Sequence, residues 1–246
     1  YAIRALKEGK NVFVEKPLCL TEEELDEVTS IVRELSDDGK SPSLMVGYNR
    51  RFSPLTVGLK EIVGDGPMSM IYRINAGPMA ADHWMQQPDI GGGRIIGEAS
   101  HFIDYMIFMC GALPVEVHGT VMEQPEHLED TVNISLRFAD GSIGVVSYFA
   151  NGPTSLPKEY IEIYRAGSAG IITDFKELDT CGRRSGRKRL PGQNKGQPQM
   201  IEAFLDSIRK GAPPPIPYAE LEAGMRATFK AIESFPLRME RHCENA

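Results

Sequence analysis

A lysine at the end of a short apolar run is the first residue that could do chemistry. The run "NVFVEKP" (11–17) is rich in valine and ends in Glu15-Lys16-Pro17. Open α/β sheets bind ligands at the carboxyl ends of their strands, so Lys16 would stand in a ligand position. Its ammonium could donate to a substrate hydroxyl, or relay a proton if burial lowers its pKa. Glu15 could pair with Lys16 or bind a ligand hydroxyl. A surface lysine is the plain alternative.

A histidine with a carboxylate on either side is the second candidate. Glu98 precedes His101 by three residues and Asp104 follows it by three, in a helix predicted over 94–110. Residues three or four apart share a helix face, and a histidine beside carboxylates suits an acid or base with a tuned pKa. A solvated polar face is the alternative. The triple glycine before it, 91–93, does not match the GxGxxG fingerprint, and it would let substrate or backbone approach closely.

Polar residues also follow a second strand-like run, in "GYNRRFSP" (47–54). Asn49 and Arg51 would again lie where a strand ends, which is the ligand position of an open sheet. A cluster of salt bridges between two domains explains Arg50 and Arg51 equally well.

Two loops complete the set of candidates. "AADHWMQQPD" (80–89) carries the only tryptophan, Trp84, and could line a substrate; a surface loop held down by Trp84 is the alternative. "CGRRSGRKRLPGQNKG" (181–196) is basic and rich in glycine. It predicts a solvated loop, with contact to an anionic ligand or phosphate as the second interpretation.

The bulk composition limits the classes of partner. The 246 residues are 41% hydrophobic and 25% charged, as in ordinary globular proteins, and the net charge of −7 argues against nucleic acid or an anionic membrane. We find no run of 18 apolar residues and no signal peptide. The cysteines, at 19, 110, 181 and 243, form no close pair. That excludes a CxxC metal site, so no metal is expected, and it predicts a reducing cytoplasm.

The elements that must position these residues change type near residue 52. Residues 1–50 alternate helix, strand, helix and strand, which predicts a right-handed parallel crossover. Two strands cannot form a stable domain alone, so 1–52 is interpreted as the remnant of a Rossmann domain that binds dinucleotides.

The second predicted domain, 53–246, is an open and mostly antiparallel sheet with helices on one face, which gives an α/β (α+β) fold class. An Asp-Gly pair inside "FADGSIG" predicts a tight hairpin. The expected strands lie within 68–77, 115–124, 130–152 and 158–175, and the expected helices within 53–66, 94–110, 197–210 and 218–234.

Four motifs, in their order and spacing, resemble the glucose–fructose oxidoreductase / inositol dehydrogenase / MocA family of NAD(P)-dependent oxidoreductases. They are "GKNVFVEKPLCLTEEE", "VGYNRRFSP", "GGGRIIGEASHFIDYM" and "KGQPQMIEAFLDSIRKG", and together they cover nearly the whole chain. The resemblance implies a Rossmann domain followed by a domain built on an open sheet. It implies hydride transfer between NAD or NADP and a hydroxyl-bearing carbon of a sugar, nucleotide-sugar or cyclitol.

The resemblance also implies roles for single residues. Lys16 matches the lysine of the family's Glu-Lys-Pro, near the nicotinamide and the reacting hydroxyl, and Glu15 and Pro17 would shape that corner of the cofactor site. His101 matches the family's acid/base histidine, and Asp104 would support it from behind.

Other matches are less regular. Asn49 and Arg51 match positions near the domain junction. The common pattern has an aspartate four residues before the histidine, where this chain has Gly97. Glu98 would replace that aspartate if the helix is rotated or if its longer side chain extends to the same place.

The start of the chain departs further from the pattern. The family's GxGxxG turn should lie roughly a hundred residues before Glu15, and only 14 residues precede it here. We therefore expect this chain alone to bind NAD(P) weakly or not at all, and to be inactive alone.

Three functions stay open at this point. The first is the dehydrogenase, with a homodimer or tetramer formed through the sheet face. The second is a non-catalytic binding or dimerisation module of the same fold. The third is lyase or glycosidase chemistry through transient oxidation.

Overall fold

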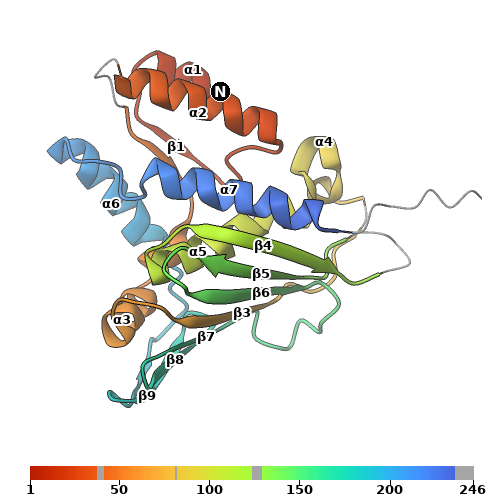
Figure 1. Cartoon of the computed structure of the whole chain (residues 1–246), viewed down its shortest axis with the longest axis vertical. Coiled ribbons are helices and arrows are strands. Elements are labelled where there is room, and N and C mark those ends of the chain that lie inside the picture. Colours follow the sequence, from red (N-terminus) through yellow and green to blue (C-terminus); the bar gives the residue numbers. More distant parts are fainter. Residues whose placement is uncertain (38–41, 81, 124–128, 236–246) are drawn as a thin grey trace, which may run out of the picture.

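Two sheets form the frame of the residues that this computed structural model describes, 1–37, 42–80, 82–123 and 129–235. One has two parallel strands and the other has eight, mostly antiparallel strands. Figure 1 shows helix α7 lying between the small sheet's helices and the large sheet. Cys19, Cys110 and Cys181 are free thiols, and Cys243 lies outside the described residues.

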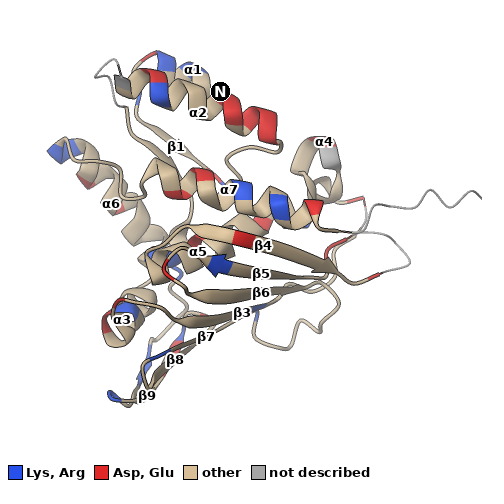
Figure 2. Ribbon diagram, in the orientation of Figure 1, with Lys and Arg blue, Asp and Glu red and all other residues tan. Residues whose placement is uncertain are grey.

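The amino-terminal unit has the helix–strand–helix–strand order that its sequence predicts. Thr21 begins α2, because its Oγ1 accepts the backbone N–H of Glu24 at 3.2 Å, and the Glu24 carboxylate accepts the N–H of Leu20 at 2.7 Å. Figure 2 shows acidic residues at the start of this helix, where the helix dipole stabilises negative charge. The elements are α1 (Ala2–Lys7), β1 (Val12–Val14), α2 (Glu22–Asp37) and β2 (Leu44–Val46).

The large sheet has the strand order β10-β9-β8-β7-β3-β6-β5-β4. β3 and β6 run parallel, and the other neighbours run antiparallel. The predicted Asp-Gly hairpin joins β5 to β6 and is confirmed. The strands are β3 (Ser69–Asn75), β4 (Pro114–Val121), β5 (Val132–Phe138), β6 (Ile143–Phe149), β7 (Glu159–Arg165), β8 (Ser168–Thr173), β9 (Glu177–Gly182) and β10 (Gly186–Arg189).

The basic stretch 181–196, predicted as a solvated loop, is partly a hairpin. Arg187 and Arg189 on β10 bind the carboxylate of Glu177 on β9, at 2.6 and 3.1 Å. Opposite charges on neighbouring strands stabilise the pair. The stretch alone does not reveal this pairing, because Glu177 lies outside it.

Helices cover one face of the large sheet, as predicted, and α5 is buried almost all round between the sheet and α7. Side chains alternate along β5, where Val132, Ile134, Leu136 and Phe138 are buried toward the helices. The predicted helix 94–110 differs at its start, where a π-helical turn, η3, precedes α5. The helices are α3 (Pro54–Val63), η3 (Ile95–Ala99), α5 (Ser100–Cys110), α6 (Gln197–Lys210) and α7 (Tyr218–Glu233).

The amino-terminal unit completes its core with helices from the other end of the chain. Its buried cluster joins Leu25 and Met45 to Phe204 of α6 and to Leu221 and Met225 of α7. Burial of such side chains stabilises each by about 1.5–3 kcal/mol. The domain boundary after residue 52 stays a prediction, since the two ends of the chain share this core.

Close packing of β4 on α7 gives a first prediction. A Cβ added at Gly119 would lie 2.2 Å from the backbone oxygen of Ala231. We expect Gly119→Ala to lower the free energy of unfolding by about 1–3 kcal/mol, because the backbones must separate. Gly58→Ala is the control, since its added Cβ meets nothing within 4 Å. In helix α3 it should raise stability by about 0.5–1 kcal/mol. Urea unfolding measures both, and equal effects would contradict the prediction.

Candidate active site

Lys16 lies at the carboxyl end of parallel strand β1 and reaches across to the start of α5. Its Nζ donates to the backbone oxygen of Gly97 at 2.8 Å. Burial lowers the pKa of this lysine, while the nearby Glu98 carboxylate opposes the shift. The side chain thus joins the small parallel unit to the large domain, and it holds a larger neutral fraction than a solvated lysine would.

Glu98 sits in the π-helical turn η3, and such turns are frequent at functional sites. Its carboxylate accepts a short hydrogen bond from the hydroxyl of Tyr148, and Lys158 Nζ lies 3.7 Å from Oε1. Burial works against ionisation, yet Lys158 and Tyr148 outweigh it and lower the pKa of Glu98. Glu98 therefore stays a carboxylate, which makes it an electrostatic partner for Lys16 rather than a proton donor.

His101 lies in the first turn of helix α5 and is 5% exposed. Its Nε2 lies 3.2 Å from Nη1 of Arg50, and its Nδ1 has no hydrogen-bond partner among the described residues. Burial, then the charges of Arg50 and Lys16, hold the pKa of His101 well below its usual value. Neither of the two predicted flanking carboxylates forms a hydrogen bond with His101 among the described residues. Glu98 bonds to Tyr148, and Asp104 bonds to another arginine.

Arg50 is held in place by a buried carboxylate. Its Nε and Nη2 donate to Glu159 at 3.1 and 3.0 Å, and Lys195 Nζ binds the same carboxylate at 2.6 Å. Tyr72 also donates to it. Burial opposes ionisation, but Arg50 and Lys195 outweigh it and lower the pKa of Glu159 to about 2. The arginine therefore presents a fixed guanidinium to His101.

This pairing predicts a pH-dependent stability. The pKa of Glu159 is lower in the folded protein than its ordinary value of 4.5, so its contribution is present above pH 4.5 and is lost as the pH falls toward 2. It amounts to about 3 kcal/mol. We expect Glu159→Gln to be less stable than wild type at pH 7, with the gap narrowing toward pH 2. Urea midpoints between pH 2 and pH 7 measure this, and a constant gap would contradict it.

The two neighbouring residues singled out from the sequence bind elsewhere. Arg51, 4% exposed, forms a short bidentate pair with Asp104 and reaches Glu220 at 2.7 Å. Burial raises the pKa of Asp104 to about 6, against the pull of Arg51. Asn49 donates to the backbone oxygen of Lys195 at 2.8 Å. Both Arg50 and Arg51 therefore form salt bridges with buried carboxylates, and Arg50 also contacts His101.

Trp84 does not hold its loop down, because 53% of it is exposed. It begins η2 (Trp84–Gln86), which precedes α4 (Pro88–Gly91). The loop is fixed instead at Gly91, where an added Cβ would lie 2.4 Å from Cα of Met85. The triple glycine thus allows backbone to approach closely, one of the two outcomes that its sequence predicts.

Sequence reasoning missed several residues of the cluster. All of them except Arg94, which lies just before η3, come from a strand or loop far along the chain, and nothing in the local pattern marks them as neighbours of His101. The signal that could have found one of them is the glutamate that opens the alternating run "EYIEIYR". The missed residues are Arg94, Tyr148, Lys158, Glu159 and Lys195.

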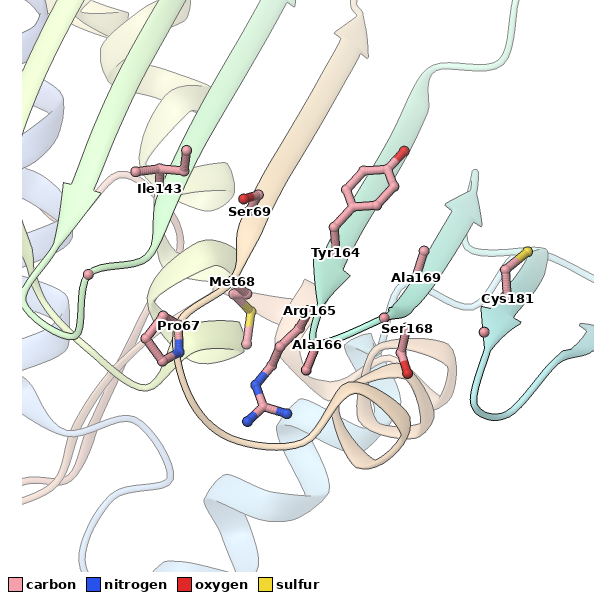
Figure 3. Close-up of a pocket in the computed structure, with 13 residues that line it drawn as sticks. Pro67, Met68, Ser69, Ile143, Tyr164, Arg165, Ala166, Ser168, Ala169 and Cys181 are labelled. Carbon is pink, nitrogen blue, oxygen red and sulfur yellow. The ribbon is translucent and has the colours of Figure 1, made fainter.

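Two searches of the described ranges complete the description. No group of three or more His, Cys, Asp or Glu side chains there could hold a metal ion. No helix in those ranges is long and apolar enough to cross a membrane. A pocket of about 530 Å³ opens where β3 and β8 begin and where β7 and β9 end, and none of the predicted site residues lines it (Figure 3).

Comparison with known proteins gives one family model and several relatives that are similar to this chain. Residues 67–173 match the model of the GFO/IDH/MocA C-terminal domain. An uncharacterized oxidoreductase of Synechocystis sp. is 28% identical over 160 residues, 56% of this chain and 42% of that protein. The scyllo-inositol 2-dehydrogenase (NADP(+)) IolW of Bacillus subtilis is 25% identical over 265 residues, 95% of this chain and 72% of that protein. The chain thus spans less than half of the first relative and about three quarters of the second.

A solved structure of levoglucosan dehydrogenase in complex with NADH and levoglucosan has the same fold. Its TM-score is 0.78 at 22% sequence identity, and the match covers 95% of this chain and 73% of that chain. The α/β class, with its large and mostly antiparallel sheet, is therefore confirmed.

Proposed function

We propose that the chain is a member of the GFO/IDH/MocA family, which the match of residues 67–173 to that family's C-terminal domain supports, and that it supplies the substrate-facing part of an NAD(P)-dependent dehydrogenase. A hydride would pass between the nicotinamide and a hydroxyl-bearing carbon of a sugar, nucleotide-sugar or cyclitol. One observation carries the proposal: the amine of Lys16 is partly buried and hydrogen-bonded at Gly97, beside Glu98 and close to His101. The names of the relatives support the same class of reaction.

The residues of this chain fit the reactive end of a dinucleotide rather than the whole of it. Glu15, Lys16 and Pro17 follow a parallel strand, where open sheets bind nucleotides. The sequence contains no GxGxxG turn that could hold a pyrophosphate. We therefore propose that these three residues flank the nicotinamide. When bound there, NAD or NADP would supply the hydride acceptor or donor.

The residues around Lys16 have separate proposed roles. Lys16 can take or give the hydroxyl proton, because its lowered pKa brings the neutral amine closer to working pH. Glu98, which stays ionised, stabilises the ammonium form of Lys16 after it takes that proton. His101 lies in the same cluster and is proposed to orient the substrate hydroxyl.

The remaining predicted site residues have weaker support. Asn49 and Trp84 are kept as proposed substrate contacts, at the rim of the cluster and on the exposed loop. Arg51 and Asp104 are proposed to support the site through the ion pair that ties the segment after β2 to α5.

The second candidate function, a binding or assembly module, is favoured by the open face of the large sheet. Ile71, Ile143 and Tyr164 are each more than two fifths exposed there. A second copy of the chain, in a homodimer or tetramer, would cover them. Sedimentation of the full-length protein tests this: Ile143→Glu should shift the oligomer toward monomer, and unchanged sedimentation would argue against it.

Turnover by the full-length protein tests the main proposal. We expect calorimetry to detect binding of NAD or NADP, and one member of a panel of polyols and nucleotide-sugars to reduce the cofactor. Product analysis separates net oxidation from a transient oxidation that returns the hydride. Cofactor binding without turnover of any substrate would favour the module.

A further inference from the structure

We propose that Arg50 is a positioning residue that keeps His101 neutral with an unprotonated Nε2, and that Lys16 therefore exchanges the proton of the substrate hydroxyl. The first half stands on the geometry of three side chains: Arg50, His101 and Glu159. The second half rests on the proposed dehydrogenase function.

The contact between Arg50 and His101 fixes the direction of one hydrogen bond. A guanidinium has five N–H donors and no acceptor. Nη1 of Arg50 lies 3.2 Å from Nε2 of His101, so Nε2 must be the acceptor and must carry no proton. A neutral imidazole with that arrangement has its proton on Nδ1. The other ring nitrogen could not take this role, because it has no partner among the described residues.

The guanidinium cannot easily turn away. Two of its other nitrogens bind Glu159, which is fully buried, and a third bond reaches Oδ1 of Asn49 at 3.0 Å. A bidentate arginine–carboxylate pair fixes the plane of the guanidinium as well as its position. Arg50 itself is 11% exposed. Its donor is therefore present at Nε2 before any ligand arrives.

The charges around His101 also oppose its protonation. Four cations act on it: Arg50, Lys16, Lys195 and Lys158. The two carboxylates in the cluster are already occupied, since Glu159 binds Arg50 and Lys195, and Glu98 binds Lys158. The remaining neighbours are apolar ring faces and edges, with Tyr48 at 5.5 Å and Phe102 at 6.3 Å between ring centroids. A fifth positive charge in this buried cluster is unfavourable.

Lys16 has the properties that His101 lacks. Within the described ranges its Nζ makes one hydrogen bond, to a backbone oxygen, so its lone pair in the neutral form is available to accept a proton. During oxidation the hydroxyl proton would pass to the Lys16 amine, while the hydride of the same carbon passes to the nicotinamide of NAD(P). During reduction the ammonium returns the proton. Glu98 then balances the ammonium charge.

Nitrogen NMR of the histidines in the full-length protein tests the first half without any turnover. We expect the His101 ring to show an unprotonated Nε2 at pH 7 and no titration down to pH 5, with the signal assigned by its loss in His101→Asn. An Nε2–H tautomer, or half-titration near pH 6.5, would overturn the proposal. Once the His101 signal is assigned, the wild-type spectrum decides between these tautomers.

A pair of variants then isolates the arginine. Arg50→Met removes the donor and leaves Glu159 bonded to Lys195 and Tyr72. It should raise the half-titration pH of His101 by about one unit or more and mix the two tautomers. Arg187→Met removes an exposed arginine from β10 and should leave the spectrum unchanged. An unchanged His101 in Arg50→Met would overturn the role of Arg50.

The pH dependence of kcat/KM tests the second half. In wild type, kcat/KM should rise with pH as Lys16 loses its proton. The midpoint pH of this rise should be unchanged in His101→Asn, and the rise should be absent in Lys16→Met. If it vanishes in His101→Asn instead, His101 carries the proton and the inference is wrong. If the wild type turns over no substrate, the proposed function fails, and with it the role of Lys16. The NMR result on Arg50 and His101 would still stand or fall by itself.

Discussion

Lys16→Met should lower kcat of the full-length enzyme by about 10²–10⁴-fold, the usual contribution of a positioned acid or base. Methionine has nearly the same length and packs where the lysine stem packs, but it can neither take the hydroxyl proton nor donate to the oxygen of Gly97. The loss should fall mainly on kcat, because the proton moves only in the chemical step. Initial rates over a range of substrate concentrations measure it.

Two further variants separate proton exchange from charge and from folding. Lys16→Arg keeps the positive charge but cannot be deprotonated at working pH, so it should be nearly as slow as Lys16→Met. Lys7→Met removes an exposed lysine on α1 and should leave the rate unchanged. A nearly active Lys16→Arg would mean that the site needs a fixed cation at this position, and the role of proton carrier would be lost.

Asp104→Ala should lower the free energy of unfolding by about 3–5 kcal/mol. The carboxylate and its partner Arg51 are almost completely buried, so its removal leaves a charge with only Glu220 to balance it. The loss of unfolding free energy should lie at the lower end of that range, because Glu220 still pairs with Arg51. Chemical denaturation at pH 7 measures it, with circular dichroism to confirm that the variant folds.

A double replacement is the control for this prediction. In Asp104→Leu with Arg51→Met, the buried charge and its partner are both removed, and apolar side chains fill the space. Pairs of this kind can replace a buried salt bridge with little loss. The double variant should therefore be more stable than Asp104→Ala. If it is less stable, the pair contributes net stability that an apolar contact cannot supply.

Most of the fold could be predicted because its elements carry local signals. The capping pair Thr21 and Glu24, the Asp-Gly turn and the alternation of β5 each depend on residues close in sequence. The parallel pairing of β3 with β6 could not be predicted, since strands distant in sequence carry no signal of their register. The β9–β10 hairpin was missed because its polar exposed side chains show no apolar alternation.

The candidate site was harder to predict than the fold. Lys16 and His101 were found from motifs, and the structure brings both into one charged cluster. Their partners were not found, because Glu159 reaches Arg50 through a tertiary contact across more than a hundred residues, and Lys195 joins the cluster by binding Glu159. A helix drawn with ideal periodicity also placed Glu98 beside His101. In the structure Glu98 lies in a π-helical turn and its carboxylate accepts a hydrogen bond from Tyr148, a contact that no local pattern indicates.

Helix α7 has a consequence for how far the site can open. It packs on α2 and β2 of the small unit, and on β4 and α5 of the large sheet (Figure 1). Any rotation of the small unit relative to the large sheet must slide one set of these contacts along α7. Interlocked side chains resist such sliding, which proceeds in small shear steps rather than as a hinge. The distance between Lys16 and Gly97 therefore depends in part on a helix that carries neither residue.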